Sequence, residues 1–231
     1  FYLYDIDDKH ELAPRLGGQL EGIGTSHPKL RVRDAAGKTL VERDIAPSHA
    51  PDVPNGQEVV GTWLSGHLGG APLAVGHRVV HGGPDLSEPV LIDDAILAKL
   101  DTFTPLAPLH QPNNLAPIRV IRERRPWIPQ VACFDTAFHR SHSDVTDRYA
   151  LPESLYQEGV RRYGFHGLSY EYIAQRLRQA LPELAMGKII AAHLGSGVSA
   201  CAMHEGKSVD STMGFTALEG LPMGTRPGRL D

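Results

Sequence analysis

The sequence has little cysteine: of its 231 residues only Cys133 and Cys201 are cysteines, and both are flanked by small or apolar residues. A disulfide framework is therefore not predicted, and we expect a cytoplasmic protein. The sequence also lacks any apolar run near the roughly twenty residues that span a bilayer, and no charged-then-apolar signal segment opens it. We therefore expect no membrane partner.

An excess of basic charge is also missing, because 23 Lys and Arg residues stand against 27 Asp and Glu, a net charge of −4. No uniform basic field exists to hold a nucleic-acid backbone, so any anion must be bound locally. What the chain does have is 41% hydrophobic and 22% charged residues. These values are typical of a soluble globular protein with a substantial core, and they exclude a disordered or fibrous chain.

Strand-like and helix-like patterns alternate along the chain. Expected strands cover 1–5, 30–34, 39–45, 73–81, 130–134, 188–194, 198–204 and 207–210, and expected helices cover 58–68, 94–100, 112–125 and 168–181. This interleaving predicts an α/β architecture. Polar residues after Arg140 predict a hinge between two lobes, 1–140 and 141–231. The pattern begins inside a strand at Phe1 and stops at Asp231 without a helix-ending signal, so we expect segments to be missing at both ends.

The segment from Gly76 to Gly83, GHRVVHGG, has the composition of a strand that runs into a turn. Alternation along a strand puts Arg78 and Val80 on one face, so a guanidinium lies beside an apolar surface. That pairing suits a small carboxylic acid, because the guanidinium binds a carboxylate or phosphoryl group and the valine accepts the alkyl end. From these eight residues alone, a structural ion pair of Arg78 is the favoured alternative.

Twelve histidines suggest a metal site, and His77 with His81 has the spacing of a helical zinc pair. The two valines between them favour a strand, in which the two imidazoles are about 13 Å apart. That separation is too large for one ion, so we predict no metal site here.

Two polar residues follow rigid or buried segments. His110 lies between prolines at the start of an expected helix, where it can point into a cleft or bond the helix N-terminus. Asp135 follows the expected strand 130–134, where open α/β sheets place ligand-binding groups. It can hold a metal ion, act as a base or cap the segment that follows.

Three further segments are rich in glycine. His166 lies between glycines directly before an expected helix, with Phe165 as the wall of an apolar pocket. HLGSG at 193–197 is a strand that breaks into a Gly-x-Gly turn, which either cradles a phosphate or closes a β-hairpin. Arg226, in a loop bounded by glycines, suits an arginine that acts on transition-state charge.

In their order along the chain, these segments resemble the acetate kinase family, which includes acetate and propionate kinases. They are GHRVVHGG at 76–83, APLH at 107–110, FDTAFH at 134–139, YGFHG at 163–167, HLGSG at 193–197 and MGFTALEGLPMGTR at 213–226. The resemblance implies part of a two-lobed, actin-like and sugar-kinase-like (ASKHA, ribonuclease H-like) fold. It also implies reversible phosphoryl transfer from ATP to acetate, which gives acetyl phosphate and ADP with the help of Mg²⁺, in a homodimer.

The resemblance also implies roles at the matching positions. Arg78 matches the substrate-binding arginine, Asp135 the active-site carboxylate, and His166 and Arg226 the two stabilisers of the transition state. His110 matches an active-site histidine. The small acyl pocket falls on Val80, Leu109 and Phe165, and the nucleotide-phosphate loop falls on His193, Leu194, Gly195, Ser196 and Gly197.

Three positions depart from the family pattern: Ser196 replaces the usual Asn, Ala217 the usual Pro, and Arg229 the usual Asp. Ala217 predicts a slightly larger acyl pocket. The family's serine-rich phosphate turn is expected before Phe1, and its adenosine loops and metal-associated Glu after Asp231. The lobe at 1–140 is then the acyl side, and 141–231 the first part of the nucleotide lobe.

Three functions follow as hypotheses. The first is an acetate kinase that works by direct in-line transfer. The second is a propionate or butyrate kinase, because Ala217 enlarges the pocket. The third is a catalytically incomplete fragment that keeps an anion-binding pocket.

Overall fold

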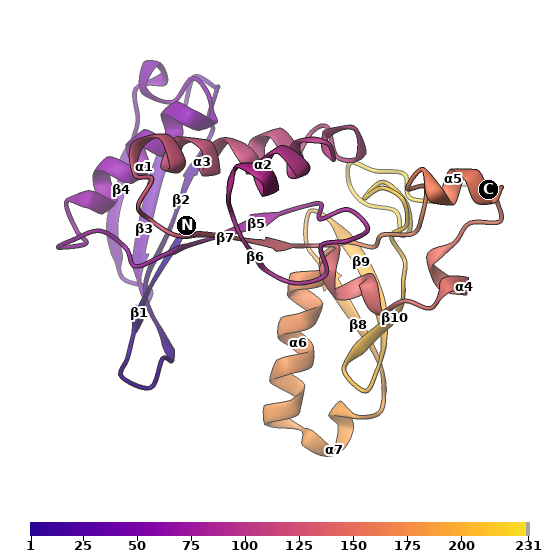
Figure 1. The fold of residues 1–231 in the computed structure, drawn as a ribbon. Coiled ribbons are helices and arrows are strands. Elements are labelled where there is room, and N and C mark those ends of the chain that lie inside the picture. Colours follow the sequence, from indigo (N-terminus) through magenta and orange to yellow (C-terminus); the bar gives the residue numbers. More distant parts are fainter. Residues whose placement is uncertain (230–231) are drawn as a thin grey trace. The chain divides into compact units, whose positions relative to one another are not determined.

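The computed structural model describes residues 1–229, which form two compact units (Figure 1). The first unit comprises residues 1–72 and 119–124, and the second comprises the rest of the described chain. Each unit has a hydrophobic core of its own. A boundary between lobes at residue 140 stays a prediction.

The first unit is built on a four-stranded antiparallel sheet in which each strand pairs with the next along the chain. Its strands are β1 (Tyr2–Ile6), β2 (Leu12–Glu21), β3 (Lys29–Asp34) and β4 (Thr39–Asp44). The expected strands at 1–5, 30–34 and 39–45 are confirmed. The sequence did not predict β2, because Pro14, Gly17 and Gly18 interrupt its strand-like pattern.

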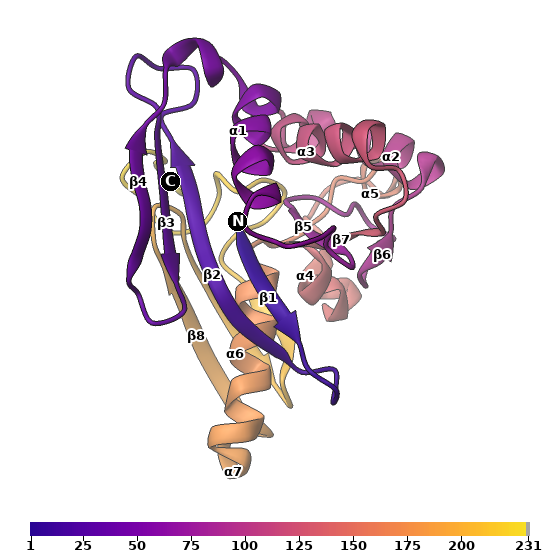
Figure 2. The same ribbon diagram turned by 90° about the vertical axis from the view of Figure 1, so that its left-hand side faces the viewer.

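One helix packs against this sheet, as Figure 2 shows. Helix α1 (Val53–Ser65) follows a short 3₁₀ turn, Pro47–His49, and starts where Asp52 accepts a 2.9 Å hydrogen bond from the Asn55 N–H. It begins five residues before the expected position 58, because Asp52 caps the helix and Pro54 fits its first turn. The buried core combines sheet, loop and helix residues: Leu16, Leu30, Val32, Ile45, Ala50 and Trp63.

The second unit begins with a three-stranded sheet in the order β5-β7-β6. Its elements are β5 (Val75–Val79), β6 (Val90–Leu91), α2 (Asp94–Asp101), a 3₁₀ turn at Thr104–Leu106, the first part of α3 (Gln111–Arg124) and β7 (Gln130–Phe134). The last part of α3, residues 119–124, belongs to the first unit. Strands β5 and β7 are parallel, with Val79 opposite Phe134. The residues that follow the two strands therefore meet at one edge. The strand expected at 73–81 ends at Val79, so Val80 and His81 lie in the turn beyond it.

The rest of this unit contains a second sheet, antiparallel and in the order β10-β9-β8, with a helix along it. Its elements are a 3₁₀ turn at Ala137–Ser141, α4 (Asp144–Asp147), α5 (Glu153–Gln157), α6 (Gly167–Ala180), α7 (Pro182–Ala185), β8 (Lys188–Leu194), β9 (Val198–His204) and β10 (Lys207–Ser211). Tyr170 and Ala174 of α6 pack on Cys201 and Met203 of β9. Figure 1 shows α6 running along this sheet. No helix of residues 1–229 is long and apolar enough to cross a bilayer.

Four histidines of the second unit make the fold sensitive to acid. Burial lowers the pKa of His81, His142 and His166 to about 4. Burial lowers the pKa of His139 to about 3. In an unfolded chain these groups titrate near 6.5, so between about pH 6.5 and 4 the unfolded state binds more protons than the folded state. The free energy of unfolding must therefore fall as the pH falls through this range.

We predict this slope for urea unfolding of the complete protein at pH 7, 6 and 5. Each such histidine contributes up to about 1.4 kcal/mol per pH unit. The variant His142→Gln should show a slope smaller by about one proton. Equal slopes in the two proteins would show that His142 is not neutral in the folded state.

Candidate active site

A carboxylate and a guanidinium pair where β5 and β7 end. Arg78 donates from Nε to Asp135 Oδ1 at 3.0 Å and from Nη2 to Oδ2 at 2.6 Å. The carboxylate is buried, whereas 65% of the Arg78 side chain is exposed. Hydrogen bonding to Asp135 raises the pKa of Arg78. The structural ion pair is therefore present, and it orients the Arg78 guanidinium. The third nitrogen of this group, Nη1, has no hydrogen-bond partner among residues 1–229.

His166 precedes α6 in an unusual backbone conformation, with φ of 60° and ψ of 19°. The next N–H, of Gly167, donates to the Asp135 carbonyl at 2.7 Å. Position 167 must be glycine, because a Cβ there would lie 2.3 Å from that oxygen. The start of α6 is thus held against the end of β7, which brings His166 to the same edge as Asp135.

The His166 ring is held on two sides. Its Nδ1 lies 2.8 Å from Ser199 Oγ, and the ring stacks on His193 with centroids 4.1 Å apart. The pKa of His166, about 4, reflects burial first and then His193, with smaller effects of Asp135, Arg78 and Arg226. The imidazole is therefore neutral at pH 7 and close to both arginines.

Arg226 reaches the same place from the C-terminal loop. A Cβ on Gly197 would lie 3.0 Å from His166 Nε2 and 3.5 Å from Arg226 Nη2, so both side chains face the turn after β8. Arg226 Nη1 donates to the Ala217 carbonyl at 2.9 Å, which fixes the guanidinium. A neutral imidazole and a cation thus both lie close to Gly197.

An apolar cluster contains two of the expected acyl-pocket residues. Val80 and Phe165 are buried together with Ala107, Tyr163 and Met213, and Ala217 packs against them. The structure does not bring Leu109 or His110 into this cluster. Both are exposed, Leu109 by 79%, because they lie in the turn before α3. Their place in a substrate site stays a prediction.

The segment 193–197 closes the hairpin between β8 and β9, where the Gly195 N–H donates to the Gly197 carbonyl at 3.1 Å. Leu194, Gly195 and Ser196 are exposed, and His193 is half-buried. The hairpin is therefore confirmed. Phosphate binding by its exposed backbone stays a prediction.

Known proteins share this arrangement of segments. The sequence model of the acetokinase family matches residues 68–231. The chain belongs to the acetokinase family. An acetate kinase of Nitrobacter hamburgensis is 55% identical over 231 residues, which are 100% of this chain and 57% of that protein. This acetokinase chain therefore spans little more than half the length of that relative.

Two solved structures are similar to this chain over nearly all of its length. The crystal structure of a propionate kinase from Francisella tularensis subsp. tularensis SCHU S4 has a TM-score of 0.87 at 34% identity, covering 100% of this chain and 58% of that one. The crystal structure of Porphyromonas gingivalis acetate kinase has a TM-score of 0.80 at 36% identity, covering 96% of this chain and 56% of that one. The expected fold class, an incomplete ASKHA fold, is confirmed for this acetokinase chain.

Sequence reasoning missed several residues that support the acetokinase site. Ser199 bonds His166 and also lies 2.5 Å from the Tyr170 hydroxyl. Glu219 accepts from the Tyr149 hydroxyl at 2.6 Å and from Arg229 at 3.1 Å, and so ties down the loop that carries Arg226. The alternation in the strand 198–204 was a signal for Ser199, since it places position 199 on the buried face.

The described part of the chain holds no cluster of side chains that would bind a metal ion by itself. Within residues 1–229, no group of three His, Cys, Asp or Glu side chains lies close enough to hold a metal ion. Both carboxylate oxygens of Asp135 accept hydrogen bonds from Arg78. We therefore derive no step of the reaction through a metal held by these residues.

The close approach at Gly197 gives a prediction for the complete protein. In Gly197→Ala the new Cβ would lie 3.0 Å from His166 Nε2, which is below normal contact, so the His166 ring must shift. We expect the rate of phosphoryl transfer to fall on the order of 10-fold, because small displacements of aligned groups are costly. Gly224→Ala is the control, because nothing lies within 4 Å of its Cβ position. Equal rates in both variants would contradict the convergence on Gly197.

Proposed function

We propose that the complete protein is an acetate kinase, which transfers the γ-phosphoryl group of ATP reversibly to acetate. The observation that carries the proposal is the arrangement at one edge of the second unit: the Gly167 N–H bonds the carbonyl of Asp135, the partner of Arg78, and His166 and Arg226 both lie close to Gly197. Phosphoryl transfer spreads negative charge over the equatorial oxygens of phosphorus. Two arginines and a hydrogen-bond donor around one point suit that charge. Membership of the acetokinase family supports the same reaction.

Acetate binds, in this proposal, between the Arg78 guanidinium and the apolar cluster. Asp135 holds Arg78 by three hydrogen bonds, so that Nη1 can donate to the acetate carboxylate. The methyl group then points toward Val80 and Phe165. One carboxylate oxygen attacks the γ-phosphorus in line, the bond to the bridging oxygen breaks, and ADP leaves with that electron pair.

His166 and Arg226 stabilise the transferring group. The imidazole is neutral, so it donates one hydrogen bond and does not contribute a charge. With the Ser199 hydroxyl donating to Nδ1, the proton lies on Nε2, which faces the Gly197 turn. Arg226 adds the positive charge. The nucleotide phosphates lie, by this proposal, at the exposed turn His193–Gly197, in which Ser196 offers a shorter side chain than the usual Asn.

The family also leads us to propose a cytoplasmic homodimer that uses ATP or ADP with Mg²⁺. The test of the reaction is the formation of acetyl phosphate from acetate and ATP by the complete protein, and of ATP in the reverse direction. Nucleotide binding by calorimetry without transfer to any short carboxylate would instead support the anion-binding fragment.

A propionate or butyrate kinase is the second candidate, because Ala217 packs against the apolar cluster where proline is usual. The propionate kinase of Francisella tularensis subsp. tularensis SCHU S4 is a structural neighbour. Comparing kcat/KM for acetate, propionate and butyrate decides between them. One methylene group changes the free energy of transition-state binding in such a pocket by about 1–3 kcal/mol.

A further inference from the structure

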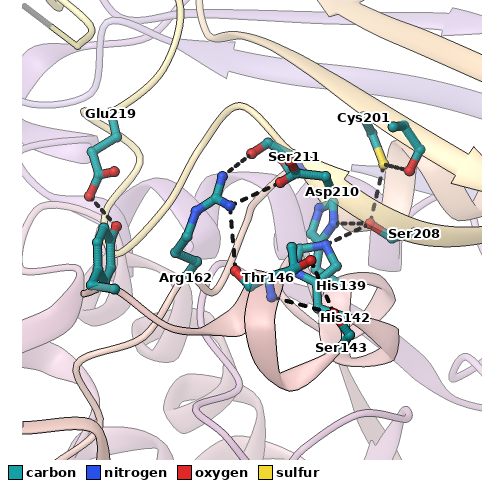
Figure 3. Close-up of polar contacts among 12 residues, drawn as sticks. His139, His142, Ser143, Thr146, Arg162, Cys201, Ser208, Asp210, Ser211 and Glu219 are labelled. Atoms are coloured by element: carbon teal, nitrogen blue, oxygen red, sulfur yellow. Dashed lines mark hydrogen bonds and ion pairs between the residues drawn. The ribbon is translucent and has the colours of Figure 1, made fainter. Parts of the chain in front are cut away.

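A buried histidine that takes no part in the proposed reaction contacts the residue before His166. His139 is completely buried. Its Nε2 lies 2.9 Å from the carbonyl oxygen of Phe165, the residue before His166. Its Nδ1 lies 2.8 Å from Ser208 Oγ, and His142 Nε2 lies 2.9 Å from the same oxygen (Figure 3). The ring therefore connects β10 to the peptide that leads into His166.

The directions of these hydrogen bonds follow from the groups involved. A carbonyl oxygen only accepts, so His139 Nε2 carries the proton. Burial lowers the pKa of His139 to about 3, so the ring is neutral and Nδ1 carries no proton. Nδ1 must then accept from the Ser208 hydroxyl, whose single proton is thereby used. His142 therefore donates from Nε2 to Ser208 Oγ, which leaves His142 Nδ1 unprotonated.

The surroundings agree with this assignment. His142 Nδ1 is buried and has no hydrogen-bond partner within residues 1–229, as expected for a ring whose single proton lies on Nε2. Donation thus runs in one direction, from His142 through Ser208 and His139 to the Phe165 carbonyl. Ser208 fixes which nitrogen of His139 carries the proton, so the peptide before His166 always meets a donor.

That peptide needs support, because His166 is in the left-handed region at φ of 60°. This conformation costs a residue with a Cβ about 1–2 kcal/mol. Gly164 lies close under the histidine, since a Cβ there would be 2.7 Å from the His139 ring. The segment 164–167 is therefore held by His139 on one side and by the Asp135 carbonyl on the other.

We propose that His139 is a positioning residue for His166: its Nε2–H holds the Phe165 carbonyl and so keeps the His166 imidazole directed at the transferring group. This proposal rests on the proposed function. His139 itself touches no substrate. Neither nitrogen of its ring is free to bind another group, since one bonds Ser208 and the other bonds the Phe165 carbonyl.

The test compares two variants of the complete protein. His139→Leu fills similar space without a donor, whereas His139→Gln places an amide N–H near the position of Nε2. We expect kcat to fall on the order of 10-fold in the leucine variant, with the KM for acetate nearly unchanged, and to stay within about 3-fold in the glutamine variant. Cys201→Ala is the control, because Cys201 touches the same Ser208 oxygen at 3.3 Å but lies outside the relay.

A second measurement does not depend on activity. NMR titration of labelled histidine follows His166, whose pKa is about 4 because the ring is buried. In His139→Leu the ring should loosen and titrate closer to 6.5, while His139→Gln and Cys201→Ala should leave its titration as in the parent protein. If the parent transfers no phosphoryl group to acetate, the proposed function fails, and this titration still tests the positioning.

His139→Asn covers the case in which His139→Leu does not fold. The shorter asparagine side chain can still face Ser208 but does not reach the Phe165 carbonyl, so the donor to Phe165 is lost. We then expect a lower kcat and a His166 pKa closer to 6.5. Parent-like kcat and parent-like His166 titration in a folded His139→Leu or His139→Asn variant would overturn the proposal, as would a glutamine variant that behaves like the leucine variant.

Discussion

Replacing Arg226 with alanine should lower kcat for acetyl phosphate formation about 100-fold or more in the complete protein. The guanidinium lies at the Gly197 turn beside His166 and is fixed there by its hydrogen bond to the Ala217 carbonyl. Its charge acts on oxygens that become more negative only as the phosphoryl group moves. The loss should therefore appear in kcat, with little change in the KM for acetate.

Arg176→Ala is the matched control for this measurement. Arg176 is an exposed arginine of α6 that bonds Gln179 at 2.7 Å, so its removal takes away the same charge at a distant surface. Its kcat should equal that of the parent. A kcat for Arg226→Ala near the parental value would contradict the proposal that Arg226 stabilises the transferring phosphoryl group.

Replacing Arg78 with alanine should lower kcat/KM for acetate at least about 100-fold, because a charged, oriented partner of the carboxylate is lost. The variant should also be less stable. Asp135 is 2% exposed, so it would remain as a buried carboxylate without its partner. A group left unpaired in this way costs about 1–3 kcal/mol. Urea unfolding measures the second effect and steady-state kinetics the first.

The double variant Arg78→Ala with Asp135→Asn separates the two effects. A neutral amide tolerates burial without a cation better than a carboxylate does, so part of the lost stability should return. The loss in kcat/KM should remain, because the acetate partner is still absent. If the double variant regained activity together with stability, Arg78 would serve the fold alone.

The β-strands and helices were largely predictable where side chains follow a clear period. The amphipathic helix α6 and the strands β8 and β9 lie within a residue or two of their expected positions. The strand β2 was missed because its glycines and Pro14 hide the alternation, and it forms through pairing with β1 and β3. The end of β5 at Val79 was missed because Val80 and His81 are as strand-like as the residues before them.

The candidate site, too, could be predicted from the sequence only in part. The sequence motifs made Arg78, Asp135, His166 and Arg226 candidates, and the resemblance to the acetate kinase family gave each of them a role. The exposure of Leu109 was not predictable from its motif. The relay from His142 to Phe165 was equally hidden, because its members lie up to 69 residues apart.

By itself the sequence determined the family, the α/β class and the residue types that can bind an acid and a phosphoryl group, since these depend on local composition and spacing. Only the tertiary structure decided that His166 and Arg226 meet at Gly197, that Asp135 holds Arg78 and that His139 supports the backbone before His166. The physical reason is that such meetings depend on how strands pair and helices pack, and no local pattern records the distance between segments that are far apart in the chain.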